Sequence, residues 1–174
     1  MVNTRVNIPG YQVNEELYNG SRTLVYRGYR ETNSLRVVIK LLKSPYPSFS
    51  ELVQFRNQYT ITKNLNSPLI IQTYSLEPYQ NGYALVMEDF GGISLKDWGV
   101  ETRLIASLQE WGVGGTLESL MEFLEIAIAL CNTLDILYRD RIIHKDIKPA
   151  NILINPETKQ VKLIDFSIAS LLPR

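Results

Sequence analysis

The spacing of apolar residues changes partway along this chain, and this change constrains the fold more than any other feature. Residues 11–17 alternate between apolar and polar side chains, residues 24–30 are rich in aromatic and β-branched side chains, and residues 35–42 continue in the same way. Turn residues around Gly20 and over 31–34 separate these runs. Short runs of this kind predict three antiparallel strands.

A helix is expected next, because the apolar period becomes helical. The recurring positions are Leu52, Phe55, Tyr59, Thr62 and Leu65. Ser48 and Glu51 match a capping box at the start of this helix, and residues 66–68 end it. Two further strands are predicted over 69–75 and 83–88.

A longer helical pattern runs over 117–138, after a glycine-dotted stretch over 91–115 that is hard to interpret. Cys131 lies in the apolar pattern of this helix and is expected to be inert core. Five strands with one intervening helix, followed by a helical region, predict an α+β fold. In this fold a small β-rich lobe over 1–90 precedes the beginning of a helical lobe over 91–174.

The composition is that of a soluble globular protein and excludes several kinds of site. Of the 174 residues, 45% are hydrophobic and 21% are charged, which is too apolar for a disordered tail. Lys and Arg total 18, as do Asp and Glu, so the charge favours neither nucleic acid nor an anionic membrane as a partner. One cysteine and one histidine cannot form an internal disulfide or a Cys/His zinc site.

No segment is predicted to cross a membrane or to direct secretion. The longest uncharged apolar run, over 126–134, is far shorter than the roughly 20 residues that a spanning helix needs. Residues 1–10 lack the apolar stretch of a signal peptide. Since a single cysteine also fits a reducing compartment, we expect a cytoplasmic protein.

The residues suited to chemistry lie close together near the end of the chain. A stretch over 143–155 presents Asp146, Lys148 and Asn151, and Asp165 follows Asn151 by fourteen residues. Carboxylate and amide oxygens suit Mg²⁺, which typically binds one or two carboxylates together with phosphate oxygens. A nearby lysine can neutralise phosphate charge, and a carboxylate in the same loop can accept a hydroxyl proton. Taken singly, the Asp and Asn residues could equally be turn formers.

This stretch resembles the catalytic loop of eukaryotic-like serine/threonine protein kinases, and the triplet at 165–167 resembles their Asp-Phe-Gly triplet. Three more segments are similar in the same order. Residues 17–28 resemble the glycine-rich loop, residues 37–40 the strand with the phosphate-binding lysine, and residues 85–90 the hinge that holds adenine. The resemblance covers residues 11–174 and extends to the N-terminal kinase modules of bacterial multidomain signalling proteins.

The resemblance implies transfer of the ATP γ-phosphate to serine or threonine hydroxyls of a protein substrate, with ATP and Mg²⁺ bound. It implies that Asp146 orients or deprotonates the hydroxyl and that Lys148 neutralises phosphate charge. It also implies that Asn151 and Asp165 hold Mg²⁺, and that His144 is structural. The implied ATP-binding residues are Leu17, Gly20, Val25, Val38, Lys40, Glu88, Phe90 and Leu153.

Several positions depart from the family pattern. Gln58 occupies the place of a helical glutamate that pairs with the strand lysine, and its neutral amide can hydrogen-bond Lys40 without adding charge. The other departures are Tyr18 and Thr23 in place of loop glycines, Lys145 in place of the arginine before the catalytic aspartate, and Ser167 in place of the glycine of the triplet.

Two other functions stay open. A pseudokinase or scaffold would bind nucleotide or partners without transferring phosphate, and Gln58 and Ser167 favour this alternative. A small-molecule phosphotransferase of the aminoglycoside type shares the spacing of Asp146 and Asn151, but such enzymes typically lack the lysine at position 148.

The chain ends nine residues after Asp165, whereas family domains continue into an activation segment and several helices. We therefore expect the N-terminal part of a kinase domain, with a natural beginning near Met1 and no activity on its own. The long helix would then expose an apolar face able to bind another chain. A longer parent chain could add C-terminal sensor or signalling domains as partners.

Overall fold

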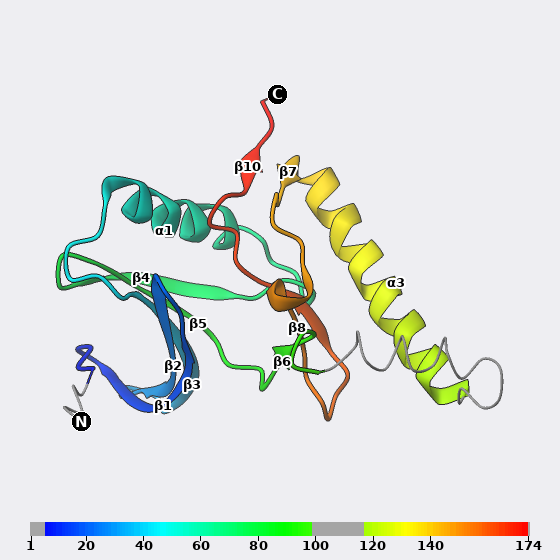
Figure 1. The fold of residues 1–174 in the computed structure, drawn as a ribbon, viewed down its shortest axis with the longest axis horizontal. Coiled ribbons are helices and arrows are strands. Elements are labelled where there is room, and N and C mark those ends of the chain that lie inside the picture. The colour runs from blue at the N-terminus through cyan, green and yellow to red at the C-terminus, as the bar shows by residue number, and fades with distance from the viewer. Residues whose placement is uncertain (1–5, 99–116, 174) are drawn as a thin grey trace. The chain divides into compact units, whose positions relative to one another are not determined.

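The computed structural model describes residues 6–98 and 117–173 (Figure 1). The chain separates into two compact units, which we describe in turn. The first unit comprises Met1–Asn66 and Gln72–Asp89, and the second comprises Ser67–Ile71 and Phe90–Arg174. The division differs from the expected lobes mainly in the segment 67–71, which belongs to the second unit.

A five-stranded antiparallel sheet forms most of the first unit, as the sequence predicts. Its strands are β1 (Tyr11–Asn19), β2 (Thr23–Arg30), β3 (Leu35–Leu42), β4 (Thr73–Tyr79) and β5 (Gly82–Glu88). Their spatial order is β1-β2-β3-β5-β4, so β3 lies at the centre (Figure 1). The turn between β1 and β2 contains Gly20, whose N–H donates to the carbonyl of Thr23 at 2.9 Å.

One face of this sheet carries the hydrophobic core of the first unit. Alternate residues of β3 and β5 lie on it, and all are buried: Val37, Ile39, Leu41, Ala84 and Val86. Ile8, from the segment before β1, packs on the same face and is 1% exposed. Because side chains alternate along a strand, Val38 and Lys40 of β3 point to the opposite face.

The helix α1 (Phe49–Thr62) begins at the predicted capping box. The N–H of Glu51 donates to Ser48 Oγ at 3.3 Å, and the Glu51 carboxylate accepts a bond from the N–H of Ser48 at 2.8 Å. These reciprocal bonds satisfy two backbone donors that the first turn would otherwise leave without partners. The helix contacts β4 and β5 through its buried side chains, which are Phe55, Gln58, Ile61 and Thr62.

The fourth strand lies later in the chain than predicted. It spans Thr73–Tyr79, whereas the apolar pattern favoured residues 69–75. Ile70 instead forms an isolated parallel bridge with Leu163, and the N–H of Leu163 donates to the carbonyl of Leu69 at 2.9 Å. An apolar run shows that a segment is buried but not which backbone it pairs with, so the error is a tertiary one.

The second unit combines one long helix with short strands. Its elements are β6 (Ile93–Ser94), α3 (Leu117–Arg139), β7 (Ile142–Ile143), the 3₁₀ turn η2 (Pro149–Asn151), β8 (Ile152–Ile154), β9 (Val161–Leu163) and β10 (Ser170–Leu171). β8 lies between β6 and β9, and β10 pairs with β7. Most of the stretch 91–115, which the sequence left uninterpreted, lies outside the described residues.

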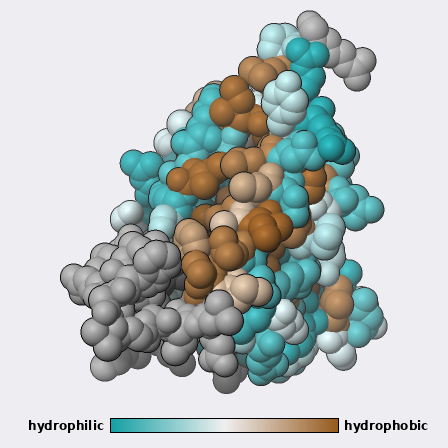
Figure 2. All heavy atoms as spheres, turned by 90° about the vertical axis from the view of Figure 1, so that its right-hand side faces the viewer, coloured by the Kyte–Doolittle hydropathy of each residue, from teal (hydrophilic) through white to brown (hydrophobic). Residues whose placement is uncertain are grey.

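The helix α3 carries a broad exposed apolar surface. Figure 2 shows apolar side chains gathered on the face that turns toward the viewer. Among the α3 side chains that the structure describes, which begin at residue 120, seven large apolar ones are exposed: Leu120, Met121, Phe123, Leu124, Ile128, Leu134 and Tyr138. No helix in the described part of the chain is long and apolar enough to cross a membrane.

Cys131 is exposed, so the expectation that it is inert core is wrong. The buried positions of α3 include Ile126, Thr133 and Leu137, which form a narrow stripe. A residue five positions after Ile126 is rotated by about 140° around the helix axis. Because the apolar pattern of α3 is wider than the stripe that is buried, the pattern alone could not show which side Cys131 lies on.

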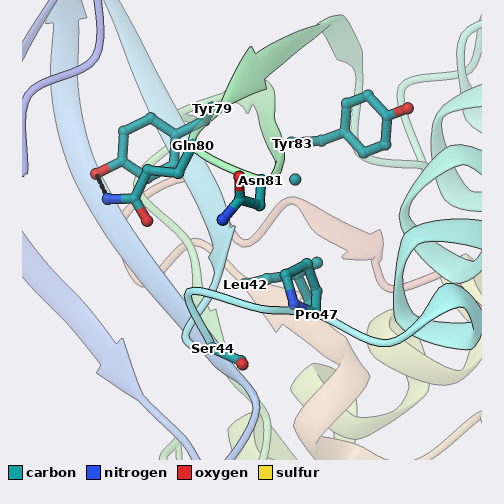
Figure 3. Close-up of a pocket in the computed structure, with 8 residues that line it drawn as sticks. Leu42, Ser44, Pro47, Tyr79, Gln80, Asn81 and Tyr83 are labelled. Atoms are coloured by element: carbon teal, nitrogen blue, oxygen red, sulfur yellow. Dashed lines mark hydrogen bonds between the residues drawn. The ribbon is translucent and has the colours of Figure 1, made fainter.

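A shallow hollow lies where β3 leads into α1 and β4 turns into β5 (Figure 3). Its lining comprises Leu42, Ser44, Pro47, Tyr79, Gln80, Asn81, Gly82 and Tyr83. Asn81 Nδ2 donates to the carbonyl of Pro45 at 2.8 Å and so ties the β4–β5 turn to the loop before α1. None of the predicted site residues lines this hollow.

Candidate active site

Lys40 lies on the second face of the sheet, in the first unit. The strand register pairs Lys40 of β3 with Val25 of β2. Because directly paired residues of antiparallel strands point to the same side, Val25, Val38 and Lys40 share this face. Val25 and Val38 are only partly buried, whereas the residues of β3 on the core face are fully buried. We call the surface formed by Val25, Val38 and Lys40 the lysine face.

Lys40 and Gln58 form the expected amide contact inside the first unit. Lys40 Nζ donates to Gln58 Oε1 at 3.0 Å, and the two residues are 9% and 1% exposed. The ammonium also lies 5.6 Å from the ring centroid of Phe55, within the range of a cation–π contact. The helix α1 therefore holds the strand lysine through a neutral acceptor.

Side chains fix the turn between β1 and β2. Leu17, predicted to bind ATP, is exposed and lies at a β-bulge. A Cβ atom placed on Gly20 would lie 2.5 Å from the Tyr18 ring, so this ring rests directly against the glycine. Lys43 Nζ donates to the carbonyl of Gly20 at 3.2 Å, which connects the turn to the residue after β3. The tyrosine thus fills space that a glycine at position 18 would leave open.

The residues predicted to form the hinge, Glu88 and Phe90, make hydrogen bonds to other residues of the chain. In the first unit, the N–H of Glu88 donates to the carbonyl of Gln72 at 3.0 Å. Glu88 Oε1 accepts a bond from the N–H of Gln72 at 2.7 Å. In the second unit, the carbonyl of Phe90 accepts a bond from Asn155 Nδ2 at 2.5 Å.

In the second unit, two neighbours hold the carboxylate of Asp146. Lys148 Nζ donates to both carboxylate oxygens, at 3.0 and 2.8 Å. Asn151 Nδ2 donates to Asp146 Oδ2 and to the backbone carbonyl of Asp146, both at 2.8 Å. The Asp146 side chain is 33% exposed, so a carboxylate with a fixed orientation faces solvent.

Asn151 and Asp165 supply oxygens of the kind that Mg²⁺ prefers. Asn151 is 6% exposed, and its amide nitrogen is directed at Asp146, so its Oδ1 is the atom available to a cation. The carbonyl of Asn151 accepts a bond from the N–H of Ile164 at 2.9 Å, which brings Asn151 next to the residue before Asp165. An amide oxygen and a carboxylate are hard donors, and phosphate oxygens and water would complete a six-coordinate shell. The donor set therefore fits Mg²⁺.

His144 joins this loop to the segment after β9. It is 2% exposed, and its Nδ1 accepts a bond from the N–H of Asp146 at 3.2 Å. Its Nε2 therefore carries the proton and donates to the carbonyl of Ile164 at 2.9 Å. Burial lowers the pKa of His144, against the opposing effect of its bond to Ile164 and of the Asp165 and Asp146 carboxylates. A neutral histidine with a single proton fits the structural role that the resemblance implies.

Asp165 adopts a left-handed backbone conformation, with φ of +63°. Non-glycine residues rarely adopt this region, although Asp does so more often than most. The next residue, Phe166, is fully buried and meets the His144 ring edge-to-face at a centroid distance of 4.6 Å. The buried ring therefore anchors the segment that presents the Asp165 carboxylate.

Lys145, which replaces the usual arginine, also has a left-handed backbone, with φ of +71°. Its Nζ donates to the hydroxyl of Ser170, at the start of β10. β10 pairs with β7 through Ser170 and Ile143, so the segment after Asp165 returns to the base of the loop. The lysine thus contributes a bond between two parts of the second unit.

Two polar residues near Phe90 were not predicted from the sequence. Asn155 accepts bonds from two backbone N–H groups of the β8–β9 turn while it donates to Phe90, so it acts as a turn former and a connector. Lys162 is 5% exposed, pairs with Leu153 across β8 and β9, and lies 5.2 Å from the centroid of the Phe90 ring. An Asn before a Pro and a Lys in a strand are common, so neither gives a specific sequence signal.

The predicted site residues divide between the two units. The first unit holds Leu17, Gly20, Val25, Val38, Lys40 and Glu88, and the second holds Phe90, Asp146, Lys148, Asn151, Leu153 and Asp165. Hydrogen bonds connect Asp146, Lys148 and Asn151 directly, and the N–H of Ile164, the residue before Asp165, donates to the carbonyl of Asn151.

Comparison with known proteins gives a consistent result. Residues 11–174 match the protein kinase domain family. The chain is 28% identical over 163 residues to serine/threonine-protein kinase PrkC of Bacillus subtilis, a match that covers 93% of this chain and 23% of that protein. It is 32% identical over 165 residues to serine/threonine-protein kinase PknA of Mycobacterium tuberculosis, covering 91% of this chain and 35% of that protein. The chain thus spans only part of the length of these relatives. It belongs to the protein kinase domain family.

Proposed function

We propose that this chain forms the nucleotide-binding and catalytic-loop part of a serine/threonine protein kinase. The observation that carries the proposal is the fixed Asp146 carboxylate, bonded by Lys148 and Asn151 and partly open to solvent. A carboxylate held in this way can accept the proton of a substrate hydroxyl as the oxygen attacks phosphorus. The serine/threonine specificity follows the names of the similar kinases and the presence of Lys148.

We propose that adenine contacts the backbone at Glu88 and Phe90 and the side chains of Val25, Val38 and Leu153, as the resemblance to the kinase pattern implies. The carbonyl of Phe90 is bonded to Asn155, which favours the N–H of Phe90 as the group that contacts the base. Lys40 would neutralise phosphate charge from the lysine face.

Asn151 and Asp165 would hold Mg²⁺ together with phosphate oxygens. The cation supplies charge neutralisation for the phosphates when it is bound. The chain's own residues do the rest: Lys148 orients the Asp146 carboxylate through a contact of 2.8 Å, and its ammonium would offset negative charge on the transferred group. A cytoplasmic location and C-terminal signalling domains stay predictions from the sequence.

The test combines nucleotide binding with phosphoryl transfer in the full-length protein. Calorimetry should detect ATP binding that requires Mg²⁺, and γ-labelled ATP should label a generic serine/threonine substrate. Asp146→Asn should abolish most transfer while leaving ATP affinity nearly unchanged, and Asp165→Asn should weaken Mg·ATP binding as well. The control is Asp135→Asn, which removes an exposed ion pair with Arg139 on α3 and should alter neither. Equal effects of the two site variants on ATP affinity would contradict the assigned roles.

A scaffold function is the second candidate, and two observations favour it. Lys40 donates to the neutral amide of Gln58 on α1, and the Tyr18 ring lies against Gly20 where phosphates would approach the turn. A scaffold predicts Mg·ATP binding without transfer by the wild-type protein. It also predicts that Asp146→Asn leaves every measured property unchanged.

A further inference from the structure

We propose that Asp89 is a positioning residue for nucleotide binding, because two arginines beside the lysine face hold its carboxylate and thereby set where β5 leaves the sheet. Asp89 directly follows β5 and directly precedes Phe90. This inference rests on the proposed function and adds a residue that the sequence comparison with the kinase pattern did not single out.

The contacts of Asp89 are short and buried. Arg27 Nε donates to Asp89 Oδ2 at 2.8 Å, and Arg36 Nη2 donates to the same oxygen at 3.1 Å. The Asp89 side chain is 2% exposed, whereas the side chains of Arg27 and Arg36 are 26% and 56% exposed. A carboxylate this deeply buried is costly to leave without partners, so the two guanidinium groups determine its position.

The two arginines lie on the same side of the sheet as the predicted adenine contacts. Arg27 pairs with Val38 across β2 and β3, so their side chains share a face. Arg36 lies two residues before Val38 on β3 and therefore points to the same side. Along β3, Arg36, Val38 and Lys40 thus follow one another on one face, and the arginine end is the end that Asp89 reaches.

The contact between Asp89 and Arg36 lies directly beyond the last residue pair of β3 and β5. The last residue pair between β3 and β5 is Val37 with Glu88, so the next pair would be Arg36 with Asp89. Arg36 and Asp89 are instead joined by a hydrogen bond between their side chains. The chain beyond Glu88 is therefore tied to β2 and β3 at the point where it leads to the backbone of Phe90.

The arginines are less suited to binding an external anion. Arg27 Nη1 donates to Glu15 at 2.7 Å, so the cluster holds two guanidinium groups and two carboxylates and its charges cancel. Burial acts to lower the pKa of Arg27, but the bonds and charges of Glu15 and Asp89 outweigh this and raise it. Both arginines donate to Asp89, and we assign them the role of positioning its carboxylate.

The test measures the affinity of the full-length protein for Mg·ATP and for adenosine. Asp89→Asn keeps the shape of the side chain but weakens both charge-assisted bonds. We expect the dissociation constants of Mg·ATP and adenosine to rise together by about tenfold, because both ligands share only the base and ribose contacts. The KM for ATP should rise by the same factor while kcat stays nearly constant. Lys40→Met should instead weaken Mg·ATP and leave adenosine unchanged.

Two variants serve as comparisons. Glu15→Gln removes a carboxylate from the same cluster without touching Asp89, and should leave both affinities unchanged. Asp89→Glu restores the charge and should recover part of the lost affinity. If Asp89→Asn does not fold, Arg36→Gln removes one donor from a half-exposed position and should raise both dissociation constants by a smaller, still parallel, factor.

The affinities of Asp89→Asn for Mg·ATP and adenosine distinguish a positioning role of Asp89 from a purely structural one. Lower thermal stability of Asp89→Asn with unchanged affinity for both ligands would show a purely structural role and overturn it. Loss of Mg·ATP affinity without loss of adenosine affinity would also overturn it, because the effect would then lie at the phosphates. If the wild-type protein binds no Mg·ATP, the proposed function fails; if the wild type binds and Asp89→Asn binds equally well, only this inference fails.

Discussion

Lys40 donates a hydrogen bond to the amide oxygen of Gln58 at 3.0 Å, in a part of the first unit where both residues are almost fully buried. An ammonium group is thus held by a neutral partner at the position where the kinase pattern has a carboxylate. The amide nitrogen of Gln58 lies 4.0 Å from the sulfur of Met87, which is a soft and polarisable neighbour. Gln58 therefore has one oxygen directed at the lysine and its nitrogen directed at a weak acceptor.

Replacement of Gln58 by Leu should destabilise the protein by about 2 kcal/mol, because the buried ammonium of Lys40 loses this acceptor. Gln58→Glu should change the free energy of unfolding by less than about 1 kcal/mol, since the gain in Coulomb attraction is offset by desolvation of the carboxylate. Urea denaturation measures both values. Gln54→Leu, on the same helix, is the matched control and should have little effect. A loss as large in Gln54→Leu would mean that the lysine contact is not the cause.

Acidification should destabilise the protein below about pH 6.5, the pKa of an unperturbed histidine. Burial lowers the pKa of His144, so between that lowered value and about 6.5 the unfolded chain takes up a proton that the folded chain does not. The free energy of unfolding therefore falls as the pH falls through this range, by at most about 1.4 kcal/mol per pH unit. Denaturation series across this range provide the measurement. As the chain has a single histidine, its imidazole signals in NMR spectra report the titration without overlap. A midpoint at or above 6.5 would contradict this prediction.

Gly28→Ala should destabilise the protein by about 3 kcal/mol, near the upper end for an overpacked position. A Cβ atom at Gly28 would lie 2.2 Å from the backbone carbonyl oxygen of Gln12 in β1, and a backbone atom in a paired strand cannot move aside easily. Gly82→Ala is the matched control, because its Cβ would meet Pro47, Leu42 and Leu52 at 3.4 to 3.5 Å at the hollow of Figure 3. It should be neutral or stabilise slightly. Thermal unfolding of both variants checks the difference, and similar melting temperatures would disprove it.

Asn151→Asp should reduce stability by about 2 kcal/mol near neutral pH, because it places a second carboxylate beside Asp146 and removes two donated bonds. Phosphoryl transfer should fall steeply, since the orientation of Asp146 depends on those bonds. Asn33→Asp is the control: Asn33 Oδ1 accepts a bond from the N–H of Leu35 at 3.2 Å, and an aspartate keeps that acceptor. Denaturation and transfer assays on the two variants should differ, and equal behaviour would refute the proposed bonding.

Much of the fold follows from local patterns. Alternation over β1 to β3 and the capping box at Ser48 and Glu51 are short-range signals, and the structure has the corresponding strands and helix. The position of Gln58 opposite Lys40 could be predicted because it rests on spacing from a recognisable motif. These features do not depend on which distant residues come together.

The features that the sequence did not reveal depend on distant partners. Residues 69–71 have the composition of a strand, but Leu69 and Ile71 form their backbone hydrogen bonds with Leu163. Asp89 is an ordinary polar residue in the sequence, and only the register of β2 and β3 brings Arg27 and Arg36 to it. Cys131 likewise lies on a helix whose buried stripe is narrower than its apolar pattern.

The backbone of Ile164 has a consequence for how this protein tolerates mutation. The N–H of Ile164 donates to the carbonyl of Asn151, and the carbonyl of Ile164 accepts a hydrogen bond from His144 Nε2. Ile164 makes both bonds with its main-chain atoms, so most side chains at position 164 preserve them and leave the link between the loop and Asp165 intact. Proline is the exception, because it removes the N–H donor. The link is therefore robust to substitution at position 164 and, since Asn151 contributes a backbone carbonyl, its vulnerable partner is His144, which contributes a side chain.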